Sequence, residues 1–185
     1  MNAKPLLLSL AIVLAIAGCA SSASKDMLAA DAPRALPDAG PVSVSWADPA
    51  TFTELRGSPD RYETARGTWL TDLASYLRKA AEAKLPAGER LELTIVDVDR
   101  AGEYEPWRGM RVQDVRIIRD IYPPRMTLNY KRYDASGAVV GEGERKLSDP
   151  GFLLGNSPIN ESDPLRYEKR LIDSWLRRED GLATR

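Results

Sequence analysis

The sequence predicts an α+β domain in which an antiparallel four- or five-stranded sheet carries two helices packed on one face. Short runs that alternate between apolar and polar residues indicate strands with one buried face. Two longer segments place apolar residues at three- and four-residue steps, the spacing of amphipathic helices. The order along the chain is strand, helix, several strands with a hairpin, and helix, which is typical of the α+β class.

The first expected strand alternates Val42, Val44 and Trp46 with serines, so these three side chains should face the core. Asp48-Pro49 should end it. The next segment, within residues 60–85, predicts an amphipathic helix. Its inward side chains would be Trp69, Leu70, Leu73, Tyr76, Leu77, Ala80 and Ala81.

The limits of this helix also follow from the sequence. Ser58 is expected to be the N-cap and Pro59 to begin the helix. Gly67 should weaken its first turns, and Leu85-Pro86-Ala87-Gly88 should end it.

The second expected strand has apolar residues on both faces. Leu91, Leu93 and Ile95 would lie on one face, and the other would carry Thr94, Val96 and Val98. A strand with both faces at least partly covered is typical of a central position in a sheet. Gly102 should end this segment.

The remaining strands are expected at residues 112–118, 126–130 and 138–146. Pro123-Pro124 should interrupt pairing between the first two, because proline cannot donate a ladder hydrogen bond. Asp134-Ala135-Ser136-Gly137 predicts a hairpin in which Gly137 takes a positive φ.

A second helix is expected after a loop over residues 151–162. Asp163 would be its N-cap, Pro164 its first residue, and Asp180-Gly181 its approximate end. Its inward side chains would be Leu165, Leu171, Ile172, Trp175 and Leu176.

Cys19 is the only cysteine of the 185 residues, and it predicts a lipid anchor. It closes Ile16-Ala17-Gly18-Cys19 after the apolar run 6–17, which resembles a bacterial lipobox. Twelve helical residues span about 18 Å, whereas a bilayer core needs about 30 Å, so the run fits a signal peptide better than a membrane span. The alternatives are an ordinary secretory signal cut after Ala23 and an uncleaved short anchor.

The lipobox implies a division of the chain and a location. Residues 1–18 would be the signal peptide, 19–40 the lipidated N-terminus with a flexible tether, and 41–185 one α+β domain. Ala20 stands where an inner-membrane retention signal has aspartate, which favours the periplasmic face of the outer membrane, with the periplasm or secretion as the fallback. The expected partner is therefore a membrane, reached through the lipid.

Composition excludes several kinds of chemistry. The chain has no histidine, and acylation of Cys19 would leave no thiol. Ser-His-Asp and Cys-His catalysis, histidine or cysteine metal ligands and disulfides are thereby excluded, and no cofactor is predicted. The net charge of −1 gives no nucleic-acid footprint.

Several strings together resemble an uncharacterised family of Gram-negative envelope proteins, the domain of unknown function number three thousand and sixteen. The resemblance covers roughly residues 42–178 and implies a periplasmic, often lipid-anchored domain without known activity or ligand. Arg100 departs from it, because an apolar residue is usual there. The strings are Val44-Ser45-Trp46-Ala47-Asp48-Pro49, Leu85-Pro86-Ala87-Gly88, Asp97-Val98-Asp99-Arg100-Ala101-Gly102, Ile121-Tyr122-Pro123-Pro124-Arg125 and Lys146-Leu147-Ser148-Asp149.

The first candidate site is the acidic stretch Asp97, Asp99, Glu103 and Glu105. Asp97 and Asp99 should share a strand face, where converging carboxylates could bind a divalent cation or act as general acid and base on a glycan. The spacing does not match a calcium-binding loop. The alternative is a strand end whose acids cap a turn and pair with Arg100 or Arg108.

The second candidate is a basic and aromatic surface formed by Trp107, Arg108, Arg111, Arg116, Arg119, Tyr122 and Arg125. Arginine pairs with phosphate or carboxylate and stacks on aromatic rings, so an anionic envelope polymer or an envelope protein could bind here. The alternative is a solvated sheet face with weak ion pairs. Trp107 lies outside any apolar stripe and should be exposed or in a groove, whereas Trp46, Trp69 and Trp175 should be core residues.

Two functions remain open on this evidence. The preferred one is a non-enzymatic binding or scaffolding module for an envelope protein or polymer. The other is a metal-dependent or carboxylate-based hydrolase acting on an envelope glycan. Convergence of three acidic residues in one pocket would favour the hydrolase, and their dispersal into arginine pairs would favour the binding module.

Overall fold

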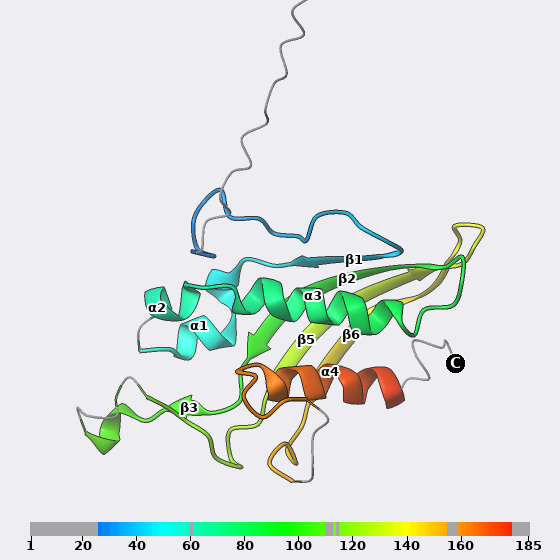
Figure 1. Ribbon diagram of the computed structural model, residues 1–185. Coiled ribbons are helices and arrows are strands. Elements are labelled where there is room, and N and C mark those ends of the chain that lie inside the picture. The colour runs from blue at the N-terminus through cyan, green and yellow to red at the C-terminus, as the bar shows by residue number, and fades with distance from the viewer. Residues whose placement is uncertain (1–25, 60, 110–112, 114, 155–158, 179–185) are drawn as a thin grey trace, which may run out of the picture.

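A computed structural model describes residues 26–59, 61–109, 113, 115–154 and 159–178. It is an α+β domain with a four-stranded sheet and two main helices on one face of that sheet (Figure 1). The strands are β1 (Val42–Trp46), β2 (Arg90–Asp99), β5 (Arg125–Tyr133) and β6 (Val139–Ser148). They lie in the order β1-β2-β5-β6, so β2 is central as predicted.

The sheet is mixed rather than antiparallel throughout. β2, β5 and β6 pair antiparallel, but β1 pairs parallel to β2, with Val44 opposite Leu93. The antiparallel prediction is therefore wrong for β1. The helical segment between β1 and β2 carries the chain back along the sheet before β2 begins, and such a crossover makes the two strands parallel.

The segment between β1 and β2 holds four helices instead of the one expected. A 3₁₀ helix, η1 (Pro49–Thr51), precedes α1 (Thr53–Gly57), α2 (Arg61–Ala65) and α3 (Trp69–Glu82). Gly67 has a φ of +90°, which separates α2 from α3, and Ser58 follows the end of α1 rather than capping a long helix. The residues expected to face the core from α3 lie against the core.

Helix α4 (Arg166–Arg178) begins two residues after the predicted start at Pro164, and its apolar side chains follow the predicted pattern. The Asp163 carboxylate accepts a hydrogen bond from the Leu165 N–H at 2.8 Å, and Leu171, Ile172 and Trp175 are buried. The Tyr76 hydroxyl of α3 donates to Asp173 of α4 at 2.8 Å, which ties the two main helices together. The expected end at Asp180-Gly181 lies outside the described residues.

A bulge in β2 changes the prediction for its second face. The register slips between Ile95 and Asp97, so that Val98 lies opposite Met126 and is buried with Leu91, Leu93 and Ile95. The prediction that Val98 faces the other way is wrong, because Val96 is the extra residue of the bulge. With Val98 inward, the face of β2 away from the helices carries mainly polar residues such as Glu92, Thr94 and Asp97.

The hairpin between β5 and β6 is confirmed. Asp134 accepts hydrogen bonds from the N–H groups of Ser136 and Ala138, and Gly137 has a φ of +86°.

The strand expected at 112–118 is shorter in the structure. Only β4 (Arg116–Ile117) forms in its described part, and it pairs with β3 (Glu103–Tyr104) in a separate two-stranded sheet.

Residues 26–40 lie along the domain and differ from the flexible tether expected over 19–40. The Leu36 N–H donates to the Val44 carbonyl at 2.9 Å, and the Trp46 N–H donates to the Arg34 carbonyl at 2.8 Å. Met27 belongs to the hydrophobic core.

Cys19 lies outside the described residues. None of the helices in the described part of the chain combines the length and the apolar character needed to cross a bilayer.

Candidate functional site

The chain leaves the four-stranded sheet after β2 and returns to it at β5. We call residues 100–124 the excursion. It contains β3, the 3₁₀ helix η2 (Pro106–Arg108) and β4 (Figure 1). It starts from the end of the sheet at which β1, β2 and β6 finish and β5 begins, and we call this the loop end. The opposite end of the strands, with the 134–137 hairpin, is the hairpin end.

Close backbone packing fixes the base of the excursion. The Gly102 N–H donates to the Tyr122 carbonyl at 3.0 Å, which joins the two ends of the excursion. Gly102 has a φ of +85°, and a Cβ there would lie 2.5 Å from Ile118 Cδ1 and 2.8 Å from the Ile117 carbonyl oxygen. Only glycine fits this position without displacing the neighbouring chain.

Two buried glutamates from different helices hold the first turn of the excursion. The Arg100 N–H donates to Glu54 of α1 at 3.0 Å, and the Ala101 N–H donates to Glu168 of α4 at 2.8 Å. Both carboxylates are almost fully buried. Since irregular backbone has no ladder to satisfy its polar groups, these carboxylates supply the missing acceptors.

Arg116 of β4 completes this arrangement. Its guanidinium forms an ion pair with Glu54, donates to the Gly102 carbonyl at 2.9 Å and lies 4.8 Å from the ring centre of Tyr104. Burial raises the pKa of Glu54, and the positive charges of Arg116 and Arg100 oppose that rise. Arg116 is therefore a structural residue of the excursion rather than part of an exposed surface.

A third buried carboxylate, Glu105, binds side chains from the middle of the excursion and from its end. It accepts hydrogen bonds from Arg119 Nη1 and the Tyr122 hydroxyl, each at 2.9 Å, and forms an ion pair with Arg108. Burial alone would raise the pKa of Glu105, but the hydrogen bonds from Tyr122 and Arg119 and the charge of Arg108 bring that pKa below its usual range. All three buried carboxylates of the described residues thus hold the excursion in place.

The acidic candidates disperse. Asp97 accepts hydrogen bonds from the N–H and the hydroxyl of Thr53 at 2.7 and 2.8 Å, which caps α1. Asp99 pairs with Arg125 at 3.1 Å, Glu103 accepts from the Tyr104 N–H, and Glu105 is held as described above. Within the described ranges, no group of three or more aspartate, glutamate, histidine or cysteine side chains is placed to hold a metal ion.

Asp99 is the acidic candidate with the environment closest to that of a catalytic acid. Burial raises its pKa, Arg125 opposes that rise, and Glu103 and Asp97 add to it. Asp97 lies on the same face of β2, as predicted, but its two carboxylate oxygens are both taken up by Thr53. Asp97 therefore serves as a cap of α1.

The basic and aromatic candidates separate into two groups. Trp107 is 70% exposed, and the side chains of Arg108, Arg119 and Arg125 are 53%, 42% and 58% exposed. Arg116 and Tyr122 are partly buried and engaged by Glu54 and Glu105. Arg111 lies outside the described residues.

Sequence reasoning missed Glu54 and Glu168. A signal for Glu168 was present, because it occupies the apolar stripe of α4 at a three-residue step between Leu165 and Leu171. A charged residue in such a stripe indicates a buried partner. Glu54 lies in a helix too short to show a stripe, so no comparable signal existed.

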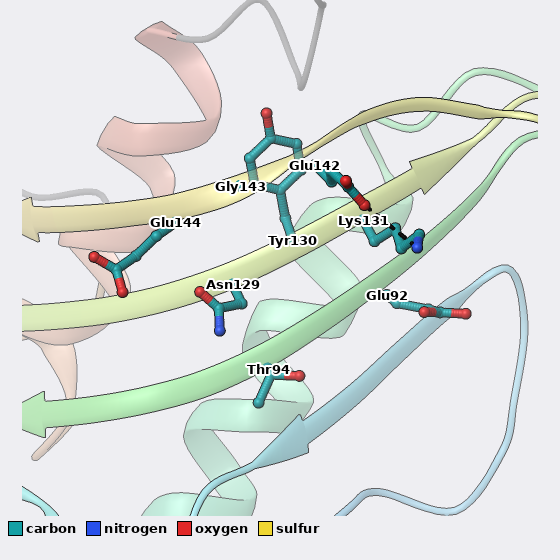
Figure 2. A pocket seen from close by; sticks show the side chains of 8 residues that line it. All are labelled: Glu92, Thr94, Asn129, Tyr130, Lys131, Glu142, Gly143 and Glu144. Atoms are coloured by element: carbon teal, nitrogen blue, oxygen red, sulfur yellow. Dashed lines mark ion pairs between the residues drawn. The ribbon is translucent and has the colours of Figure 1, made fainter.

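In the described part of the chain, no helix covers the other face of the sheet (Figure 1), which is a second exposed surface that we call the open face. Its side chains form rows across the strands; one row consists of Ser45, Thr94, Asn129 and Glu144. Figure 2 shows three of these side chains, Thr94, Asn129 and Glu144, following one another across β2, β5 and β6. A shallow groove of about 430 Å³ here is lined by Glu92, Thr94, Asn129, Tyr130, Lys131, Glu142, Gly143 and Glu144.

Most charges on the open face have partners within it. Lys131 pairs with Glu142 at 3.3 Å, as Figure 2 shows, and the Tyr133 hydroxyl donates to Glu92 at 3.0 Å. The Ser45 and Thr94 hydroxyls share a hydrogen bond of 3.0 Å. The groove is therefore polar, open and largely satisfied by its own pairs.

One comparison with known proteins gives a match. A family model described as "Protein of unknown function (DUF3016)" matches residues 40–178. No curated protein and no solved structure matches the chain.

Proposed function

Because the chain belongs to the DUF3016 family of proteins of unknown function, as its motifs indicated, we propose a function from its own structure. The protein is a non-enzymatic binding module of the cell envelope. A lipid on Cys19 holds it at the periplasmic face of the outer membrane, and side chains around Trp107 contact an envelope component.

The observation that carries this proposal is the exposure of Trp107 close to the buried, hydrogen-bonded Glu105. Trp107 is 70% exposed, while Glu105, two residues earlier, is buried and bound to Arg108, Arg119 and Tyr122. Tryptophan and arginine dominate the energetics of binding surfaces. A surface whose backbone is already fixed loses little conformational entropy on binding.

The dispersal of the acidic residues supports binding over hydrolysis. A glycan hydrolase needs two carboxylates facing one bond at a defined separation. Here Asp97 caps a helix, Asp99 pairs with Arg125, and Glu105 is enclosed by its partners. These structural roles explain why the acidic residues are present without a role in hydrolysis.

The anchor is testable by itself. Growth with a palmitate analogue should label the wild-type chain and not a Cys19→Ser variant. The labelled chain should fractionate with outer membranes. Equal labelling of both chains, or a purified chain that begins at another residue, would remove the anchor from the proposal.

Binding through the excursion is tested by crosslinking in intact cells. A photoreactive amino acid at position 107 should give adducts whose masses are reproducible. The matched control is position 139, because Val139 is also exposed, at 47%, but lies beside the hairpin. The proposal fails if position 107 gives no adducts, or if both positions give the same background.

A further inference from the structure

Exposed apolar side chains concentrate at the loop end. Of the eight large hydrophobic side chains exposed in the described part of the chain, only Val139 lies at the hairpin end. The other seven belong to α2, to the excursion and to the loop after β6. They are Tyr62, Trp107, Val115, Ile118, Ile121, Leu153 and Leu154.

The sheet topology places all three segments at this end. Helix α2 follows the end of β1, the excursion follows the end of β2, and the 151–154 loop follows the end of β6 (Figure 1). The Asp149 N–H donates to the Pro124 carbonyl at 3.4 Å, which brings the last loop to the base of the excursion. The exposed apolar residues therefore come from separate segments of one end.

The described chain also begins at the loop end. The Met27 N–H donates to the Ala65 carbonyl at the end of α2 at 3.1 Å, and Asp26 bridges to Arg66. Cys19 precedes Asp26 by seven residues, which can span at most about 25 Å. A lipid on Cys19 would therefore keep the start of the described chain within about 25 Å of the bilayer.

The hairpin end is farther from this starting point. The nine residues of β5 separate the two ends by roughly 30 Å. The short connection therefore favours orientations in which the loop end is the part of the domain nearest the membrane.

The side chains at the loop end suit the interface between lipid and water. Tryptophan is enriched at the headgroup level, where its apolar ring and polar N–H are both accommodated. Arginine can extend its charge to lipid phosphates while its stem lies along apolar surface. Arg108, Arg119 and Arg125 are exposed here, and each also forms an ion pair with Glu105 or Asp99.

We propose that the loop end rests on the phospholipid bilayer that holds the lipid anchor, with Trp107 and Ile121 at the headgroup level. This inference rests on the proposed function, because it names the component that the excursion contacts. The contact would add a second attachment to the lipid and would fix the orientation of the domain. The open face would then stand away from the membrane plane and remain accessible.

Tryptophan fluorescence of the lipidated full chain tests the proposal. The chain contains four tryptophans, of which Trp46, Trp69 and Trp175 are buried, so Trp107 supplies the exposed emission. The protein is reconstituted in vesicles of phosphatidylethanolamine and phosphatidylglycerol, with and without brominated acyl chains. The spectrum of a Trp107→Phe variant is subtracted, which leaves the Trp107 component.

We expect brominated lipid to quench the Trp107 component and the bilayer to reduce its quenching by iodide several-fold. The matched control combines Trp107→Phe with Val139→Trp, which moves an exposed tryptophan to the hairpin end. That tryptophan should be quenched by iodide and not by brominated lipid. Iodide quenching of Trp107 equal to that of the control, or equal quenching of both positions by brominated lipid, would overturn the proposal.

This outcome is distinguishable from failure of the proposed function. The mass of the purified chain first establishes whether Cys19 carries lipid. If it does and Trp107 remains in water, while position 107 still crosslinks to a protein in cells, the binding module stands and its partner is that protein. If position 107 gives no adducts in cells, the proposed function itself fails, whether or not Cys19 carries lipid.

Discussion

The loop end and the open face are both exposed, but they are built in opposite ways. At the loop end, Glu54, Glu105 and Glu168 hold the excursion, and the excursion, α2 and the 151–154 loop present apolar side chains. The open face consists of regular strands, and it presents hydroxyl, amide and charged groups in rows. The loop end thus buries charged side chains and exposes apolar ones, whereas the open face exposes polar side chains, as is usual for a protein surface.

The difference shows which side chains the fold requires and which it does not require. A sheet satisfies its own backbone, so its outer face needs only polar side chains that interact with water and with one another. The excursion needs its buried carboxylates, because they accept backbone and arginine hydrogen bonds. It does not need an exposed Trp107 or Ile121 for the same purpose, so contact with another surface is the simplest reason for these residues.

The largest expected effect tests which face of β2 is open. Ile95 is fully buried on the helix side, whereas its neighbour Thr94 lies on the open face. Ile95→Asp should lower the free energy of unfolding by about 4 kcal/mol or more, because it buries an unpaired charge. Thr94→Asp should cost less than about 1 kcal/mol. Similar costs in urea denaturation would show that the open face is covered.

The next effect tests the buried carboxylates of the loop end. Glu54→Ala leaves Arg116, whose side chain is 18% exposed, without its carboxylate and the Arg100 N–H without its acceptor. Removal of one partner of such a buried pair should cost about 3 kcal/mol. Glu92→Ala on the open face is the control, with an expected change within about 0.5 kcal/mol. If the two variants unfold at the same denaturant concentration, the carboxylates do not hold the excursion.

A smaller effect is expected from a comparison of two glycines with nearly the same backbone conformation. Gly102 and Gly137 have φ values of +85° and +86°, but a Cβ meets neighbouring atoms only at Gly102. Gly137→Ala should cost about 1 kcal/mol for the conformation, and Gly102→Ala about 2 kcal/mol more for the clash. Equal changes in melting temperature would mean that the excursion is not packed on its base.

Fold class, core and hairpin could be predicted from the sequence because they depend on local patterns. Alternation placed Val42, Val44 and Trp46 in the core, and the three- and four-residue steps placed Leu171 and Trp175 there as well. The direction of β1 could not be predicted in this way. It depends on how the helical crossover returns to the sheet, which is not a local property.

The candidate site was predicted in part. Exposure of Trp107 followed from its position outside any apolar stripe, and the pairing of acids with arginines was one of the two alternatives. Arg116 was placed on the surface wrongly, because its partner Glu54 is distant in sequence. The bulge that turned Val98 inward likewise depends on pairing with β5 rather than on the sequence of β2.

The smallest expected effect is a pH dependence at the loop end. Burial raises the pKa of Glu54 above 4.5, although Arg116 and Arg100 oppose the rise and Glu168 adds to it. The folded protein therefore holds this proton more tightly than the unfolded chain, and the contribution of Glu54 to stability decreases as pH rises through the raised pKa. The wild type should gain stability relative to Glu54→Gln as pH falls from neutral to 4.5. Parallel stability curves would contradict a raised pKa.

The central claim is that another surface covers the loop end in the cell while the open face stays in water. Hydroxyl-radical footprinting, on the purified chain and in intact envelopes, tests it through Trp107 and Tyr133, which lies on the open face beside Glu92. We expect Trp107 to be oxidised rapidly in the purified chain and protected several-fold in envelopes, with Tyr133 unchanged. Equal oxidation of Trp107 in both samples, or protection of Tyr133 instead, would contradict the claim.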